Sequence, residues 1–378
     1  MHDLYFRYIV FFAAFLVLVT CTTEFIPELR EQNQMLVVEG LLTDQQETQT
    51  IKISRSLPIG RNIIKRPIHG CTVAISDDLN NIAFFYETDS GIYVSPEMFH
   101  GEAGRSYILH ISAPDVSGTG IRNYESSPAI LQPVPPIDSL YYEKTIVRDL
   151  EFPDFDIHTC QIYLDTYGSN SGYLRWEYFE TWILRLLFSV PDQKCWVSDH
   201  SKEILIKNTT ATGQTYIKKQ PVIYISNKTD RLQTKYSILV NQYSMNEDEY
   251  NYWAALKTLS DGSGGLYDVI PAAVPGNIRC IEDSSETVLG YFSVSAKSSK
   301  RIFIDEIFRG IINQYSNCIT DTVYGDVPIR GIDTTVWVLF DRPAATPIPR
   351  RRILTSTWGC YSCTARGTKE RPSFWIGE

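Results

Sequence analysis

Closely spaced alternating segments are the feature that most limits how this chain can fold. Apolar and polar residues alternate in the runs "MLVVEGLL", "TIKISRS", "CTVAISDD", "IAFFYETDSGIYV" and "SYILHISA", which are separated by turns such as "DDLNN", "DSG" and "GEAG". A period of two is typical of half-buried strands, and no helical period lies between these runs. Residues 21–136 are therefore predicted to form an immunoglobulin-like β-sandwich.

A proline-rich segment ends this first series of strands. In "ILQPVPPIDSLYYE", Pro133, Pro135 and Pro136 cannot donate ladder hydrogen bonds and favour a stiff polyproline II conformation. A domain boundary is therefore predicted near Pro136. Further runs such as "CQIYLDT", "GYLRWEYFETWIL" and "KYSILVNQY" follow it. They predict that residues 137–378 form a second, larger β-rich domain, so that the whole chain is mainly β.

One stretch of this second segment has a helical pattern. In "SMNEDEYNYWAALKTLSDGSGG", Ser244 stands three residues before Glu247, as in a capping box, and glycines follow the last turn. A short helix is predicted near residues 245–259. Its apolar side chains lie on roughly one face, which we expect to pack against a sheet. These side chains are Tyr250, Trp253, Leu256 and Leu259.

The N-terminus has the pattern of an export signal. Every residue from Ile9 to Val19 is apolar, which is short for a permanent membrane span but suits a signal peptide over residues 1–20. The four residues that end at Cys21 resemble a bacterial lipobox, with Thr20 as a departure from it. Lipid attachment at Cys21 is therefore expected. An ordinary secretory peptide and an uncleaved anchor are the alternatives.

Composition agrees with a folded, exported protein. Hydrophobic residues make up 43% of the chain and charged residues 21%, which is enough apolar material for a sizeable core. The formal net charge of -9 argues against a nucleic-acid partner, because phosphate binding depends on clustered Lys and Arg.

Seven cysteines remain once Cys21 is set aside, and export permits disulfides among them. Cys71 alternates with apolar residues and is expected to be a buried small hydrophobe. A zinc site or redox pair at Cys360 and Cys363 is disfavoured, because further ligands and the usual strand-helix context are missing. The disulfide is expected in the late cluster of Cys318, Cys360 and Cys363.

Motifs spread over most of the mature chain resemble a known family. They include "VVEGLLTD", "PVPPIDSLYYE", "RWEYFETW", "YWAALKTLSDGSGGLYD", "VLGYFSVS" and "CYSCTARGTKERPSFW". In this order they resemble a Bacteroidota outer-membrane lipoprotein family known only as a domain of unknown function. Its members are typically encoded beside TonB-dependent receptors. The resemblance implies a lipid-anchored location at the outer membrane, and it supplies no catalytic residues. The cell-surface side is expected, with the periplasmic side as the alternative.

The sequence does not predict an enzyme. Ser263 lies in "DGSGG", which lacks the Gly-x-Ser-x-Gly spacing, and the histidines of the mature chain lack metal-ligand spacing. No cofactor or metal is expected. Two functions remain. The first is a non-enzymatic accessory lipoprotein that works with a TonB-dependent receptor in nutrient uptake or surface assembly; the second is an independent adhesin or glycan-binding module.

Two further groups of candidate residues follow from local patterns. Ser139, in the linker, lies in an Asp-Ser-Leu triplet that resembles a bacterial O-glycosylation acceptor. The loop over residues 261–278 is long and rich in Gly and Pro, and such loops in compact domains are usually functional or disordered. Its apolar residues are expected either to contact a partner, with Tyr267 as the anchor, or to pack into the second domain. They are Leu266, Tyr267, Val269 and Ile270.

Overall fold

Strands make up most of the computed structural model, and the mainly β fold expected from the sequence is confirmed. The structure describes residues 34–56, 66–116, 118–148, 156–186, 190, 192–210, 215–262, 274–311, 318–326 and 337–377. The longest helix within these ranges is α2 (Glu247–Gly262). No helix in them has both the length and the apolar character needed to cross a membrane.

The first sheet folds back on itself as a sandwich. Strand β5 makes the turn, because Phe85 pairs with Val73 of β4 while Tyr86 pairs with Val94 of β6. Residues from both halves then share one core, including Leu36 and Leu109. The consecutive strands are β1 (Leu36–Leu42), β2 (Thr50–Arg55), β3 (Arg66–Pro67), β4 (Thr72–Asp77), β5 (Ile82–Asp89), β6 (Ile92–Val94), β7 (Ser106–Pro114), β8 (Ile121–Ser126) and β9 (Ala129–Ile130).

Two strands from the second half of the chain complete this sandwich. Strand β17 (Ile278–Cys280) pairs antiparallel with β8, and β18 (Leu289–Val294) pairs parallel with β1. Phe292 of β18 is fully buried in the first core. The sandwich predicted over residues 21–136 therefore lacked two of its strands, which the prediction had placed in the second domain. At Pro136 the chain does pass from the first core to the second, since β10 begins at the next residue.

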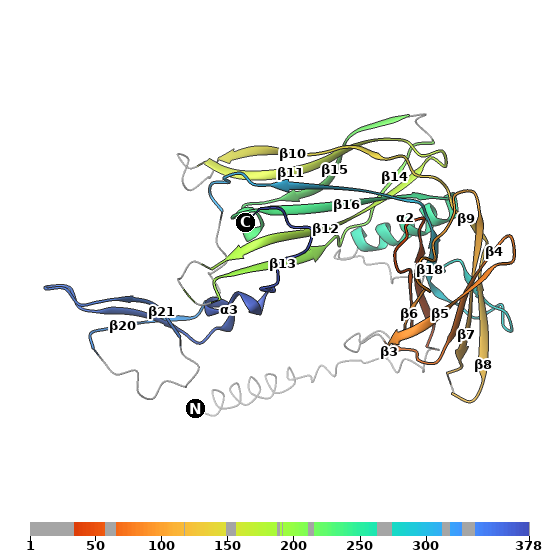
Figure 1. Cartoon of the computed structure of the whole chain (residues 1–378), viewed down its shortest axis with the longest axis horizontal. Coiled ribbons are helices and arrows are strands. Elements are labelled where there is room, and N and C mark those ends of the chain that lie inside the picture. The colour runs from red at the N-terminus through yellow and green to blue at the C-terminus, as the bar shows by residue number, and fades with distance from the viewer. Residues whose placement is uncertain are drawn as a thin grey trace, which may run out of the picture.

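The second core lies between two antiparallel sheets. The smaller sheet contains β10 (Ile137–Arg148), β11 (Asp156–Tyr167) and β15 (Tyr216–Ile225). Buried residues from both sheets meet in this core, for example Ile162 and Trp176, and Figure 1 shows the two sheets beside the first sandwich. The larger sheet contains β12 (Tyr173–Arg185), β13 (Lys194–His200), β14 (Leu205–Asn208), β16 (Tyr236–Met245) and β19 (Lys297–Ile304); a short 3-10 helix, η1 (Asp230–Leu232), precedes β16.

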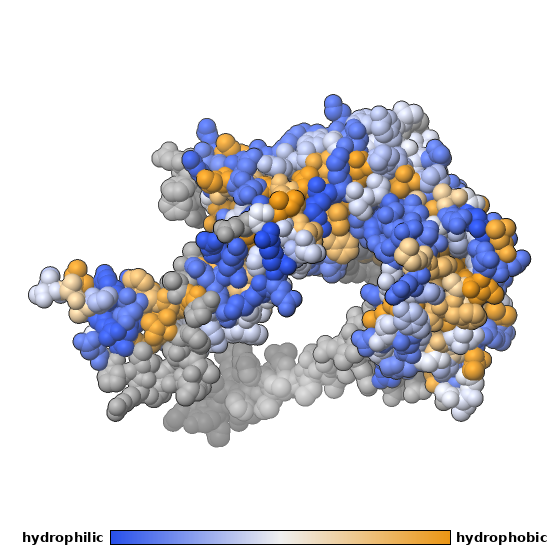
Figure 2. Space-filling view, in the orientation of Figure 1, coloured by the Kyte–Doolittle hydropathy of each residue, from blue (hydrophilic) through white to orange (hydrophobic). Residues whose placement is uncertain are grey.

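A small C-terminal sheet projects below the second sandwich in Figure 1, at the end opposite the first sandwich. Its apolar residues Val338, Phe340 and Ile348 are 41–48% exposed, and apolar surface is visible there in Figure 2. The sheet contains β20 (Thr320–Tyr324), β21 (Trp337–Arg342) and β22 (Arg351–Thr355), and it is followed by α3 (Trp358–Tyr361) and η3 (Cys363–Ala365).

Covalent and polar contacts attach the C-terminal segment to the second sandwich. Disulfides join Cys195 of β13 to Cys363 and Cys318 to Cys360. The backbone N–H of Trp196 donates to the Thr368 carbonyl at 2.8 Å, and the Thr368 N–H donates back at 2.9 Å. The predicted cysteine cluster is thus disulfide-bonded throughout, although Cys363 bonds to Cys195, which the sequence did not single out.

Gly290 allows the close approach of β18 to β1, which gives a first prediction. Its φ is +86°, and an added Cβ would lie 2.0 Å from the carbonyl oxygen of Val38. Gly104 has nearly the same φ, +87°, with nothing within 4 Å of its Cβ position, so it is a matched control for backbone strain alone. Gly290→Ala should lower the free energy of unfolding by about 2 kcal/mol more than Gly104→Ala. If denaturant titrations showed the same loss of unfolding free energy for both variants, this role of Gly290 would be contradicted.

The two disulfides give a second prediction. Cys195 and Cys363 are separated by 168 residues, and Cys318 and Cys360 by 42. Constraint of the unfolded chain corresponds to about 5 and about 4 kcal/mol for loops of these lengths. Replacing both Cys195 and Cys363 by Ala should therefore lower the denaturation midpoint strongly, whereas Cys71→Ala, which breaks no cross-link, should change it little. Peptide mapping without reduction that found other pairings would refute the connectivity.

Candidate functional site

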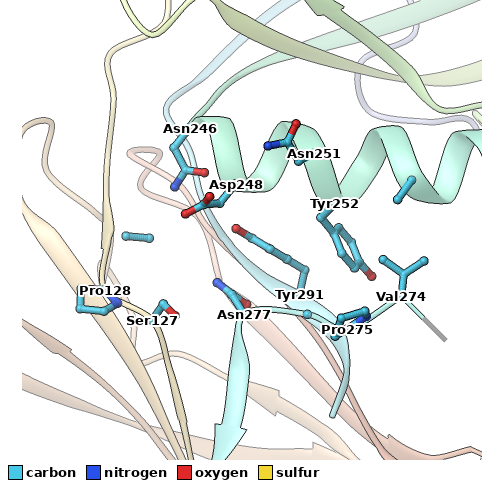
Figure 3. Close-up of a pocket in the computed structure, with 13 residues that line it drawn as sticks. Ser127, Pro128, Asn246, Asp248, Asn251, Tyr252, Val274, Pro275, Asn277 and Tyr291 are labelled. Carbon is cyan, nitrogen blue, oxygen red and sulfur yellow. The ribbon is translucent and has the colours of Figure 1, made fainter. Parts of the chain in front are cut away.

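A pocket of about 390 Å³ lies where α2 meets the first sandwich (Figure 3). Small-molecule sites commonly have volumes of about 300–1,000 Å³, so this pocket is large enough for a small ligand. One wall is the first half of α2, and the opposite wall is the connection from β8 to β9 together with residues 274–277. Tyr291 of β18 lies between them. The pocket is thus built from four separate parts of the sequence.

The start of α2 is fixed by Asn246. Its side-chain oxygen Oδ1 accepts a hydrogen bond from the Glu249 N–H at 2.8 Å, as an N-cap residue does. The capping role predicted for Ser244 is wrong, because Ser244 is the penultimate residue of β16 and its hydroxyl donates to the Gln132 carbonyl. Ser244 instead ties the end of β16 to the segment between the two sandwiches.

The body of α2 packs on the larger sheet of the second sandwich, as the sequence predicted. Tyr250 contacts Tyr173 of β12 with ring centroids 5.0 Å apart, and Lys257 Nζ donates to the Ile204 carbonyl. The predicted apolar face, which includes Trp253 and Leu256, is half-buried. The helix is therefore held firmly on one side while its first turns reach the pocket.

Behind this wall lies a buried acid, Glu249, which is 1% exposed. Trp253 Nε1 donates to it at 3.3 Å. The Arg175 guanidinium lies 4.7 Å from the ring centroids of both Trp253 and Tyr243, so it is held between two aromatic faces. Burial raises the pKa of Glu249, although the positive charge of Arg175 opposes the shift. The pattern of predicted apolar residues did not reveal this polar layer.

Two tyrosines form the floor of the pocket. Tyr252 of α2 and Tyr291 of β18 have ring centroids 4.8 Å apart and ring planes inclined by 34°. Burial and the carboxylates of Glu249 and Asp248 raise the pKa of Tyr291, and burial raises the pKa of Tyr252 to about 12. Both hydroxyls therefore remain protonated at neutral pH and can donate hydrogen bonds.

The opposite wall is tied to β18. The side-chain amide of Asn277 donates to the Phe292 carbonyl and accepts from the Phe292 N–H, both at 2.9 Å. The Asn277 carbonyl in turn accepts from the Ser127 N–H at 2.7 Å. Asn277 therefore positions the backbone of the first sandwich against the pocket.

The charge of the pocket limits what it can bind. Asp248 is its only charged lining residue within the described ranges, and the described lining residues include no Lys or Arg. Glu249 lies just behind the wall. This arrangement disfavours anionic ligands, so neutral and cationic ones remain. The pocket could not be predicted from the sequence, because its lining comes from four segments that are far apart in the chain. These are residues 127–129, 246–255, 274–277 and 291. The one local signal was the group of Asn and Asp residues at the start of the helix.

Several predicted site residues lie outside the described ranges. These are the lipid-attachment residue Cys21 and the proposed partner-contact residues Leu266, Tyr267, Val269 and Ile270. The loop that contains the latter four is described only at its ends. At Val274 it lines the pocket, so the described end of the predicted partner loop and the pocket adjoin each other.

The structure places the other predicted residues as follows. Ser139 is half-buried in β10 opposite Asp165, so its placement in a linker was wrong. Cys71 is a free, half-buried cysteine that packs against the first core. Cys360 and Cys363 do not pair with each other. Within the part of the chain that the structure describes, no three His, Cys, Asp or Glu side chains form a group that could hold a metal ion.

Fold and site together define a mainly β protein with two cores and a small-molecule-sized pocket at their junction. Residues 22–301 match a family described as Domain of unknown function (DUF4249), and the chain belongs to this family. The matched range contains both walls of the pocket, whereas the C-terminal sheet follows it. No curated protein matches the sequence.

The buried Glu249 gives a third prediction. Because its pKa is raised on folding, it contributes stability below the unfolded pKa, and that contribution is lost as pH rises through the folded pKa. Glu249→Gln keeps the acceptor for Trp253 Nε1 and does not titrate. The unfolding free energy of the variant relative to that of the native protein should therefore increase from pH 4 to pH 8, by about 1.4 kcal/mol for each unit of pKa shift.

Denaturant titrations at several pH values measure this difference. Glu97→Gln is a suitable control, because Glu97 is exposed on the surface. Its difference from the native protein should be nearly constant over the same range. A difference for Glu249→Gln that falls as pH rises would mean that the positive charge of Arg175 outweighs burial.

Proposed function

We propose that this protein is a non-enzymatic accessory lipoprotein of the outer membrane, and that it works with a TonB-dependent receptor in nutrient uptake. Anchoring through Cys21 is supported by the apolar run and the lipobox-like residues that precede it. The link to a receptor is supported by the resemblance to a Bacteroidota lipoprotein family. Membership of a family of unknown function is consistent with the lipid anchor and with the link to a receptor.

The observation that carries the proposal is the pocket at the junction of the two sandwiches. Its walls are held in place by Asn246 and Asn277, so it is formed before any ligand binds. A preformed pocket lowers the entropy lost on binding. Such a pocket suits a protein that captures a small molecule and passes it on.

A second candidate function is that of an independent adhesin or glycan-binding module. One feature favours it: the outward face of β5 presents three apolar side chains in succession. Exposed aromatic residues of this kind are common in interaction surfaces. The three are Ile82 at 59% exposure, Phe84 at 62% and Tyr86 at 53%.

The anchoring step gives a fourth prediction. Cys21→Ser removes the thiol that would carry the lipid, and stable anchoring needs more than one acyl chain. The variant should therefore move from the membrane fraction to the soluble fraction of cells, whereas Cys71→Ser should stay in the membrane fraction. Retention of Cys21→Ser in membranes after a high-salt wash would contradict the lipid anchor.

Co-purification separates the two functions. The tagged full chain is extracted from outer membranes in mild detergent, and its partners are identified by mass spectrometry. A TonB-dependent receptor recovered in stoichiometric amount supports the accessory role. Recovery of the chain alone, while it still binds to whole cells or glycan-coated beads, supports the adhesin.

A further inference from the structure

We propose that the junction pocket binds a neutral saccharide, with Tyr291, Tyr252 and Asp248 as its contact residues. The inference rests on the proposed role in ligand capture, and it adds the chemical class of the ligand. Three properties of the pocket lead to it: the charge of its described lining, the Tyr291 hydroxyl at its floor, and its position between the two sandwiches.

The charge of the lining argues against an anionic ligand. Asp248 is exposed at the pocket, Glu249 is buried behind it, and the described lining contains no basic side chain. Phosphate and carboxylate groups are normally held by Arg, Lys or free backbone N–H groups. Here the N–H of Glu249, in the first turn of α2, is already bonded to Asn246. A neutral ligand is not repelled by the acidic side chains and does not need a basic side chain to hold it.

The floor of the pocket offers an unused donor. Tyr291 is 8% exposed, and within the described ranges its hydroxyl has no hydrogen-bond partner. Figure 3 shows Tyr291 between the start of α2 and Asn277, with its hydroxyl end toward Asp248. Because Tyr291 lines the pocket, its hydroxyl can form a hydrogen bond with a ligand or with water there. The hydroxyl therefore points to a ligand with polar groups at this depth.

The combination of groups matches a sugar. A saccharide ring has C–H groups on its faces, which pack on aromatic rings, and hydroxyls around its edge, which bond to carboxylates, amides and phenols. The pocket presents the rings of Tyr252 and Tyr291 next to the carboxylate of Asp248. An apolar ligand would leave Asp248 and the tyrosine hydroxyls unpaired.

The position of the pocket adds a measurable consequence. Asp248 and Tyr252 belong to α2, which packs on the second sandwich, whereas Tyr291 and Ser127 belong to the first. A ligand in the pocket therefore contacts both units. Since it binds the native arrangement only, it should stabilise the protein by RT ln(1 + L/Kd), where L is the free ligand concentration, and raise its melting temperature as that concentration rises.

The test uses the full chain, purified in a detergent without a sugar headgroup. The probes are maltotriose, cellotriose and mannotriose, with trigalacturonate as the anionic comparison and trilysine as the cationic one. Titration calorimetry and thermal melting should show saturable binding of at least one neutral trisaccharide, with a Kd of about 1 mM or lower. Neither charged probe should bind as tightly.

Three variants assign the binding to the pocket. Tyr291→Phe removes only the hydroxyl and should weaken binding about fivefold, and Asp248→Asn, at an exposed position, should do so to a similar extent. Tyr252→Ala should weaken it about tenfold. The matched control is Tyr224→Phe at an exposed position of β15 outside the pocket, which should bind as the native protein does.

The proposal is overturned if no neutral trisaccharide binds, if a charged probe binds more tightly, or if folded Asp248→Asn and Tyr291→Phe bind the saccharide normally. The function proposed above is tested separately by receptor co-purification. If Asp248→Asn loses saccharide binding and the receptor still co-purifies with it, both the saccharide proposal and the accessory role are supported. A receptor recovered with a native protein that binds no saccharide removes only the ligand class, and saccharide binding without a receptor removes only the accessory role.

Discussion

The parallel pairing of β18 with β1 is the contact on which the rest of the molecule depends. Strand β18 closes one end of the first sheet, and only Ser295 and Ala296 separate it from β19 in the second sandwich. The Ser295 N–H donates to the Leu42 carbonyl, and the Lys297 N–H donates to Asp44 Oδ1. The chain therefore crosses between the two cores while it remains hydrogen-bonded. This fixes Tyr291 opposite α2, and the pocket follows from it.

A second connection runs beside the first, through Gln242. Its Nε2 donates to the Pro135 carbonyl at 2.8 Å and to the Thr166 hydroxyl at 3.0 Å, while its Oε1 accepts from Trp176 Nε1 at 2.7 Å. A fully buried amide of this kind is stable only when its groups are paired. Gln242 thus anchors the proline-rich segment onto the second core. The junction is held by specific polar bonds as well as by apolar packing.

Much of the fold could be predicted from the sequence because it depends on local patterns. Alternation in runs such as residues 106–114 indicated strands, and the acidic and apolar pattern of α2 indicated a helix. The boundary near Pro136 followed from proline chemistry. The transfer of β17 and β18 to the first sandwich could not be predicted, because pairing with β1 joins residues about 250 positions apart and a short apolar strand carries no mark of its partner.

The candidate site was not predictable for the same reason. Tyr291 looks like any other residue of a buried strand, and its role depends on Tyr252 lying 4.8 Å away on a helix. Glu249 resembled one of several acids at a helix start, yet it is the one that is buried. Helical periodicity indicates which face of α2 packs, but it cannot show that a charged group is enclosed with Arg175. Such pairs are visible only when the tertiary contacts are known.

The disulfide between Cys195 and Cys363 has a consequence for how the protein withstands proteolysis. It closes a covalent ring that contains α2, β17 and β18. A protease that cuts the backbone once anywhere between these two cysteines leaves both fragments joined. Because the fragments stay linked, strands β18 and β19 remain at high local concentration beside their partners and can re-form their pairing. A single cut in this ring therefore need not end the working life of the molecule.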